Sequence, residues 1–211
     1  MTNIPSTNNI QNNNKINKIN KIPSSSSSLP PRTSQRALLF SLLTSITALL
    51  TSPPSASLVN PCFSSLRSLA SHFEIGFEEC ITRKVKGNAR KYPVEVCRGK
   101  SGKYTAYSDV TGVTKDASTH KFDDFDGEGE AWDMEKIKSE VIKFVNDRDW
   151  NKYHTIDNLK LALTGELGEL CEIFQWNEEV GKEERERIGM EIADVAVYLI
   201  RICQVQRIEG W

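Results

Sequence analysis

The sequence predicts an all-α protein, in which a helical bundle follows an N-terminal tract without a core. In the C-terminal half, apolar residues recur at the spacing of a helix face from Asp133 to Asp149, from Leu159 to Phe174 and from Ile188 to Ile202. An upstream segment, from Leu66 to about Tyr92, repeats that spacing. In addition, two pairs of acids fall on the apolar faces of the last two segments, which indicates helices that face each other across a polar site.

Residues 1–57 form a tract rich in Asn, Ser and basic residues, and the first acid in the chain is Glu74. Such a composition predicts a low-complexity targeting region outside any folded core. Its apolar run Ala37–Leu50 is too short for a stable membrane span, and Ser52–Ser57 resembles a processing site. We therefore expect an organellar protein, plastid or mitochondrial. The alternative is a cytosolic protein with a disordered tail.

Length, net charge and cysteine content limit the number of domains, the class of ligand and the redox compartment. With 211 residues and a net charge of −1, the chain has room for one ordinary domain and no basic excess for binding a nucleic-acid polymer. Its five cysteines include no C-x-x-C pair, so neither a zinc site nor a disulfide framework is expected. A reducing compartment and a small ligand follow from these features.

The upstream helical segment lies in a region that we place at residues 58–107. Gly76 is expected to divide this helix into two, and Pro93 to end it after Tyr92. Residues 108–131 are polar and acidic and are expected to be a linker. The helical core that carries the paired acids is then residues 132–211.

Glu166 and Glu169 form one acid pair, and Glu191 and Asp194 form the other. Each acid lies inside or beside the apolar stripe of its helix. Acids on helices are usually solvated, but an ionised carboxylate on a core-facing stripe costs several kcal/mol unless it is paired or holds a metal. Lys160 is the only base between His154 and Trp176 and falls on another face. Oxygen ligands without His or Cys favour Mg²⁺, with Mn²⁺ as the alternative.

Aromatic residues flank the helix that carries the first acid pair. Trp150 and His154 precede it, Trp176 follows it, and Tyr198 lies one turn after Asp194 on the next helix. We expect Trp150, His154 and Trp176 to sandwich a nucleobase whose phosphates reach the metal. Each of these residues alone is more often a packing residue.

Several motifs together resemble the dCTP pyrophosphatase branch of the MazG-like all-α nucleoside triphosphate pyrophosphohydrolases, over about residues 132–205. They are Asp149-Trp150, Tyr153-His154, Asn158-Leu159, Gly165 to Leu170, Phe174-Gln175-Trp176, Glu191 to Val195 and Tyr198-Leu199. The resemblance implies a MazG-like bundle that hydrolyses dCTP, or a modified dCTP, to the monophosphate and pyrophosphate with Mg²⁺. It also implies metal ligands at Glu166, Glu169, Glu191 and Asp194, with Glu166 or Glu169 acting on the water, and a nucleotide pocket at Trp150, His154, Trp176 and Tyr198.

The chain departs from the family's pattern in two places. Ile156-Asp157 stands where the family commonly has Pro-Arg, which leaves the substrate preference open. The family's last helix, expected after Tyr198, is matched upstream instead by Lys84 to Pro93. The resemblance implies that Lys84 and Asn88 contact the nucleotide there, whereas without it they are expected to lie on a solvated basic helix face.

This order is equivalent to a circular permutation or to two truncated tandem copies; an incorrectly assembled gene product is a third explanation. The upstream helix is expected to complete the site either within its own chain or on a neighbour. Helices with exposed apolar stripes also favour a homo-oligomer. The alternative function is a catalytically impaired MazG-like protein that binds nucleotide or associates with an intact relative.

Overall fold

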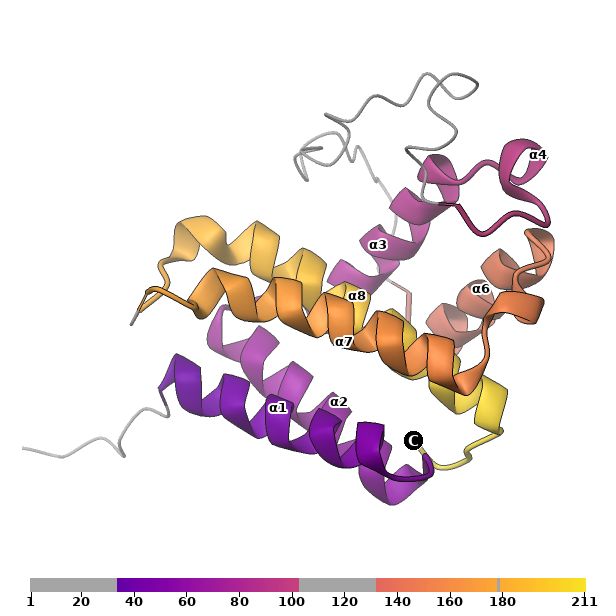
Figure 1. The fold of residues 1–211 in the computed structure, drawn as a ribbon. Coiled ribbons are helices and arrows are strands. Elements are labelled where there is room, and N and C mark those ends of the chain that lie inside the picture. Colours follow the sequence, from indigo (N-terminus) through magenta and orange to yellow (C-terminus); the bar gives the residue numbers. More distant parts are fainter. Residues whose placement is uncertain (1–33, 103–131, 178) are drawn as a thin grey trace, which may run out of the picture. The chain divides into compact units, whose positions relative to one another are not determined.

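The computed structural model describes residues 34–102, 132–177 and 179–211, all of which belong to one structural unit, Thr33–Trp211. These residues form seven α-helices and two short 3-10 helices, and no strand occurs among them (Figure 1). The all-α prediction is confirmed for this part of the chain. The α-helices are α1 (Gln35–Thr51), α2 (Ala56–His72), α3 (Phe77–Lys91), α4 (Val94–Cys97), α6 (Met134–Asp147), α7 (Ile156–Phe174) and α8 (Arg185–Gln206); the 3-10 helices are η4 (Asn151–Tyr153) and η5 (Lys182–Glu184).

Polar side chains fix where three of the helices begin. Ser34, Asp133 and Thr155 are the N-caps of α1, α6 and α7, and the side chain of each accepts a hydrogen bond from the backbone N–H three residues later. Gly76 is the N-cap of α3 and separates that helix from α2, as the sequence predicts. The expected linker at 108–131 lies outside the described residues.

The prediction for residues 34–57 was wrong, because the structure places them in the folded core. Leu39, Leu42, Ile46 and Leu49 of α1 are all buried, and they belong to the same apolar cluster as residues of α7 and α8. Their spacing of three, four and three residues is that of one helix face, which composition alone does not reveal. The targeting role remains a prediction for the residues before Ser34.

Helix α8 is the centre of the bundle, because it packs against α2, α3, α6 and α7. Its core residues Ile188, Ile192, Val195 and Leu199 are fully buried. The α1–α2 pair lies along α7 and α8 in Figure 1, and α3 crosses behind α8. The helices that carry the four predicted acids are therefore held on several sides.

Helix α3 and the segment that follows it are fastened to the end of α6. Arg148 is 3 % exposed, and its guanidinium donates to the carbonyl oxygens of Tyr92 (2.7 Å), Ala89 (3.3 Å) and Phe144 (2.9 Å). These acceptors lie in the last turn of α3, immediately after it and in α6, and carbonyls at helix ends favour a cation. In addition, the Tyr153 hydroxyl donates to the Gly99 carbonyl at 2.7 Å. The upstream segment is thus docked onto its own chain.

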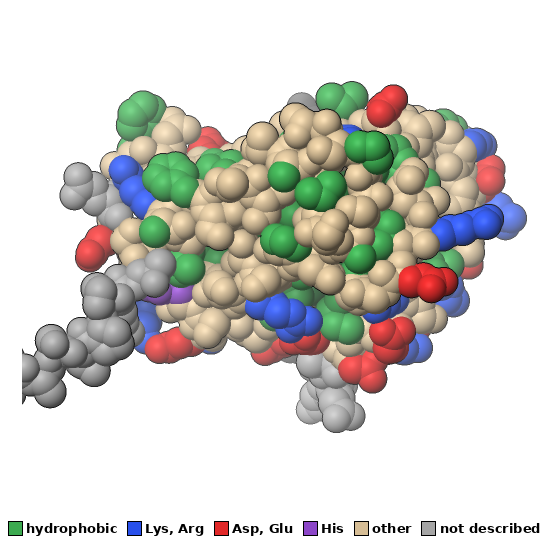
Figure 2. Space-filling view, turned by 90° about the horizontal axis from the view of Figure 1, so that it is seen from below, with side chains coloured by type: hydrophobic (Ala, Val, Ile, Leu, Met, Phe, Trp, Pro, Cys, Tyr) green, Lys and Arg blue, Asp and Glu red, His purple; other side chains and the backbone are tan. Residues whose placement is uncertain are grey.

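The face formed by α1 and α2 carries few charges. After Arg36, the next charged residue in the chain is Arg67. Figure 2, seen from below the view of Figure 1, shows hydrophobic side chains scattered over the middle of this face, with most acidic and basic side chains near its margins. Among the helices of the described residues, none is both long and apolar enough to cross a membrane.

Candidate metal and nucleotide site

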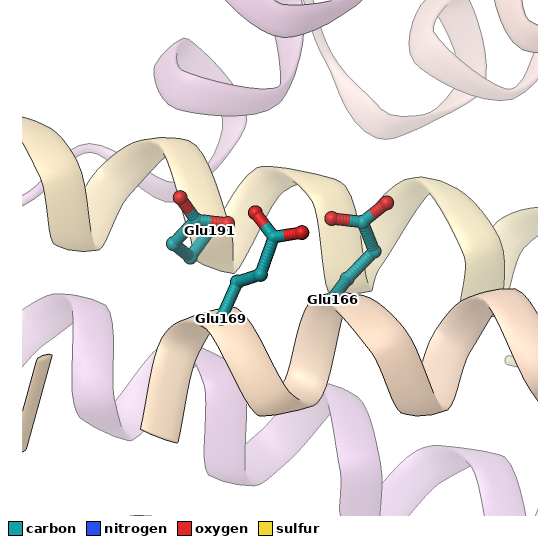
Figure 3. A group of neighbouring side chains, drawn as sticks. All are labelled: Glu166, Glu169 and Glu191. Carbon is teal, nitrogen blue, oxygen red and sulfur yellow. The ribbon is translucent and has the colours of Figure 1, made fainter. Parts of the chain in front are cut away.

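Three of the four predicted acids meet between α7 and α8. Glu166 and Glu169 extend from α7 and Glu191 from α8, and one carboxylate oxygen from each lies within 4.8 Å of the others (Figure 3). The i, i+3 spacing on α7 puts two of the carboxylates on one face, and the α7–α8 packing supplies the third. The three glutamates thus lie together, and their role as metal ligands stays a prediction.

Asp194 is close to this three-glutamate cluster but is not one of its members. Its carboxylate pairs with the Lys84 ammonium of α3, and the two side chains are only 13 % and 12 % exposed. Helix α3 packs on α8 and brings Lys84 to this position, although about 110 residues separate the two in the sequence. The predicted four-acid set is therefore divided between a cluster of three and an ion pair.

The surroundings of the cluster disfavour its negative charge. Burial raises the pKa of Glu166 to about 7, and the nearby Asp194 and Glu169 carboxylates add to the shift. Burial, with Asp194 next, raises the pKa of Glu191 to about 7 as well. Burial also raises the pKa of Asp194, while Lys84 opposes the shift. A cation placed among the three glutamates would relieve these costs.

One carboxylate oxygen of Glu191, Oε2, is buried and has no hydrogen-bond partner among the described residues. An unpaired buried carboxylate oxygen is costly unless something absent from the protein chain satisfies it. Three carboxylates without His or Cys suit a hard divalent cation such as Mg²⁺ or Mn²⁺. The residues present thus fit a metal of this kind.

Lys91 is a charged neighbour that the sequence analysis did not single out. It follows Lys84 by seven residues on α3, which places both on nearly the same helix face. Burial and Lys84 lower the pKa of Lys91, and Asp194 and Glu191 oppose this shift. The signal that reveals Lys91 is this seven-residue spacing from Lys84. Asn88, one turn after Lys84, is half-buried on the same helix.

Trp150 and His154 lie close together before the start of α7. Their ring centroids are 6.5 Å apart, and the Trp150 indole N–H donates to the Lys100 carbonyl at 2.7 Å and to the Cys97 carbonyl at 3.2 Å. The rings of Tyr92 and Phe144 contact Trp150 edge-on. Part of the Trp150 surface is therefore used to hold the segment after α3.

Trp176 does not join these two residues in the same chain. It follows the C-terminal end of α7, where it is 85 % exposed, whereas Trp150 and His154 precede the N-terminal end. A helix with the 19 residues of α7 is about 28 Å long, so one base cannot contact both tryptophans of a single chain. The expected sandwich was wrong for one chain, because periodicity gives the face of a residue but not its distance along the helix.

Tyr198 is half-buried on α8, one turn after Asp194. Burial raises the pKa of its phenol, and the carboxylates of Glu166 and Asp194 add to that shift. The hydroxyl is therefore neutral and lies within the electrostatic reach of the acids. That Tyr198 contacts a nucleotide stays a prediction.

Taken together, the fold and the site define an all-α protein with a carboxylate cluster between two packed helices and a lysine brought in by a third. The chain is 37 % identical over 83 residues to dCTP pyrophosphatase 1 from Bos taurus and from Homo sapiens, which covers 36 % of this chain and 49 % of each relative. The rat protein of the same name is 37 % identical over 76 residues, covering 33 % of this chain and 45 % of the relative. No protein-family model matches the chain. No solved structure matches it either.

The chain spans about half the length of the curated relatives it matches. The similarity thus supports a partial homology to dCTP pyrophosphatase 1, of the MazG-like group.

Proposed function

We propose that the protein is a nucleoside triphosphate pyrophosphohydrolase that converts dCTP, or a modified dCTP, to the monophosphate and pyrophosphate. The observation that carries this proposal is the convergence of Glu166, Glu169 and Glu191 beside the Lys84–Asp194 pair. Carboxylates that hold a divalent cation next to an ammonium group form a site for a polyphosphate. The partial similarity to dCTP pyrophosphatase 1 supports the choice of nucleotide.

Glu166, Glu169 and Glu191 are the residues that would hold Mg²⁺, with Mn²⁺ as an alternative. The ion, when bound, would screen phosphate charge and lower the pKa of a water molecule. Glu169 or Glu166 would orient that water and accept its proton, so that the oxygen attacks the α-phosphorus in line. Lys84 would turn from Asp194 toward the phosphates and balance the charge of the pyrophosphate that leaves. Asp194, Asn88 and Tyr198 would contact the ion or the nucleoside.

We also propose that α3 completes this site within its own chain, in an order that is permuted relative to the family. The Lys84–Asp194 pair supports this arrangement, as do the hydrogen bonds from Arg148 to Ala89 and Tyr92. Both contacts join α3 to helices that follow it in the sequence. Self-association remains part of the proposal, because Trp176 is exposed and a second copy would bring in another tryptophan.

The experiment is an assay of the full chain with dCTP and Mg²⁺. We expect dCMP and pyrophosphate in equal amounts, no orthophosphate, and no turnover by Glu166→Gln. The matched control is Glu172→Gln, which removes an exposed acid from the same helix and is expected to keep wild-type activity. Release of orthophosphate, or full activity of Glu166→Gln, would exclude the proposed reaction.

A second candidate function is a catalytically impaired protein that binds nucleotide or an intact relative. It is favoured by the pairing of Asp194 with Lys84, which takes one acid of the predicted set, and by the use of Trp150 to hold residues 97–100. This candidate predicts that dCTP binds in the presence of Mg²⁺ and is recovered unchanged. Calorimetry combined with product analysis distinguishes the two functions.

A further inference from the structure

Arg201 is a buried arginine whose three side-chain partners are all neutral. It lies on α8, seven residues after Asp194, and is 5 % exposed. Its guanidinium donates to His154 Nδ1 (3.1 Å), Gln204 Oε1 (2.7 Å) and Asn151 Oδ1 (3.2 Å). No carboxylate pairs with Arg201 within the part of the chain that the structure describes. A buried cation without a counter-ion is costly, and these three hydrogen bonds offset part of that cost.

The contact with His154 determines the chemical form of that histidine. Arginine Nε carries a hydrogen and can only donate, so His154 Nδ1 must present its lone pair. In a neutral imidazole the proton then resides on Nε2. Protonation of Nδ1 would remove the acceptor of this hydrogen bond. It would also place two positive charges next to each other. Burial and the charge of Arg201 accordingly lower the pKa of His154 to about 4, so the ring is neutral at physiological pH.

The Nε2–H group of His154 faces no protein acceptor among the described residues. The ring lies beside Trp150, with the two planes tilted by 53°. Of the charged groups near this turn, Arg201 is the one that acts on His154, while Lys152 is paired with Asp149 at 2.8 Å. The arrangement therefore offers one fixed hydrogen-bond donor next to an aromatic ring.

We propose that Arg201 is a positioning residue that holds His154 as its Nε2–H tautomer, so that this histidine donates to an acceptor atom of the bound nucleotide. The proposal rests on the proposed function in one respect, the identity of the ligand. An aromatic face with a single donor selects for an oxygen or an unprotonated nitrogen of a nucleoside, and rejects an amino group at that place. Gln204 and Asn151 accept the other two hydrogen bonds of the guanidinium.

The first test observes His154 directly in the full-length protein. Nitrogen-15 NMR of the imidazole rings distinguishes the two tautomers, and His154→Gln assigns the signal among the three histidines of the chain. We expect the wild type to show the Nε2–H form without titration between pH 5.5 and 8. Arg201→Met should raise the pKa of His154 above its wild-type value, while burial still holds it below the ordinary value of about 6.5. A wild-type histidine in the Nδ1–H form, or one that titrates near 6.5, would overturn the proposal.

The second test measures the nucleotide. In Arg201→Met, the KM for dCTP should rise about fivefold, the effect of one neutral hydrogen bond, while kcat changes little. KM should also become pH-dependent at a higher pH than in the wild type, because the His154 ring is then protonated more readily. Gln204→Leu is the matched control, because it removes another partner of Arg201 and leaves the His154 contact; it should not change the tautomer. A similar pH dependence in Gln204→Leu would reduce Arg201 to a structural role.

A substitute variant and a binding titration test the proposal where the first variant does not fold or the wild type shows no turnover. If Arg201→Met does not fold, Arg201→Lys retains a donor for Nδ1 and should keep the tautomer while losing one of the other hydrogen bonds. If the wild type shows no turnover, the proposed function fails, yet dCTP can still be titrated with Mg²⁺ while the His154 Nε2 signal is followed. A signal that stays unchanged at saturation would refute the role of His154 as a donor to the nucleotide.

Discussion

The ammonium of Lys84 and the carboxylate of Asp194 form an ion pair from which solvent is largely excluded, with 12 % and 13 % of the two side chains exposed. Lys84 precedes all three glutamates of the cluster in the sequence, yet this pair places it beside them. The pair therefore brings α3, which comes early in the chain, to the acids of α7 and α8. Its position predicts where α3 docks, and its burial predicts how much stability is lost when Lys84 is removed.

If α3 completes the site within its own chain, two defective chains cannot repair each other. Co-expressed Lys84→Met and Glu166→Gln chains should show no more activity than either variant alone. Each variant mixed with wild type, as a control, should leave wild-type activity in proportion to its amount. Recovery of activity in the doubly defective mixture would show that α3 docks onto a neighbouring copy.

Removing Lys84 should also destabilise the fold, because Asp194 would remain buried without its counter-ion. We expect Lys84→Met to lower the free energy of unfolding by about 3 kcal/mol, and the further change Asp194→Asn to restore most of it. Lys136→Met, which breaks an exposed pair with Glu140, should cost less than about 1 kcal/mol. Urea unfolding of these four proteins measures the coupling; equal losses for the buried and the exposed pair would argue against it.

Binding of Mg²⁺ to the cluster should stabilise the folded state. At a hundredfold excess over the dissociation constant the gain is about 2.7 kcal/mol, which corresponds to a rise in melting temperature of about 5 °C or more. Glu191→Gln should abolish most of this rise, because it removes the carboxylate with the unpartnered oxygen. Glu186→Gln, an exposed change on the same helix, should retain it. A full Mg²⁺ response in Glu191→Gln would place the ion elsewhere.

The raised pKa values give the stability a defined dependence on pH when divalent ions are chelated. Burial raises the pKa of Glu191 in the folded state from its ordinary value of 4.5 to about 7, so the folded state holds its proton more firmly than the unfolded state does. Its contribution to the free energy of unfolding is therefore greatest below pH 4.5 and is lost as the pH rises through about 7. His154, with its pKa lowered to about 4, contributes in the opposite direction below about 6.5.

The measurement that separates these two contributions is the difference between wild type and Glu191→Gln in urea unfolding from pH 5 to pH 8. His154 is common to both proteins and cancels. We expect the variant to gain stability relative to wild type as the pH rises, up to about pH 7, and the gain to shrink when Mg²⁺ is added. A difference that does not change with pH would mean that Glu191 titrates normally.

Arg148 should prove essential for holding the end of α3. Arg148→Met leaves the carbonyls of Ala89 and Tyr92 without their charged donor and should cost about 2 to 4 kcal/mol. Hydrogen exchange should quicken first in residues 89–100. Arg98→Met removes an exposed arginine from the same segment and serves as the control. Uniform loss of protection across all helices would indicate a general defect instead.

The sequence predicted the core helices α3, α6, α7 and α8, but not α1, because the apolar residues of these four follow the helical period closely. It also predicted that Glu166, Glu169 and Glu191 converge, since each lies on a face that must meet the other helix. Hydrophobic periodicity depends only on residues that are close in the sequence. It is enough to predict a helix, and the convergence of the glutamates needs in addition only the contact between α7 and α8.

Hydrophobic periodicity does not predict contacts between segments that are far apart in the sequence. The pairing of Lys84 with Asp194 depends on how α3 crosses α8, and only the family resemblance hinted that Lys84 belongs to the site. Trp176 was misplaced because the length of α7 separates it from Trp150. Arg201 was missed because a charged residue in an apolar stripe looks like a register exception until its neutral partners are seen.

The packing of α1 bears on the predicted targeting role of the residues before Ser34. Lys160 Nζ donates to the carbonyls of Leu50 and Ser52, both at 2.9 Å, so the end of α1 is tied to α7. A protease that cut within Ser52–Ser57 would remove four buried side chains and both of these acceptors from the folded protein. If the residues before Ser34 carry a targeting peptide, as their composition predicts, we expect its cleavage to fall upstream of the Ser34 cap, because a cut there leaves α1 in the core.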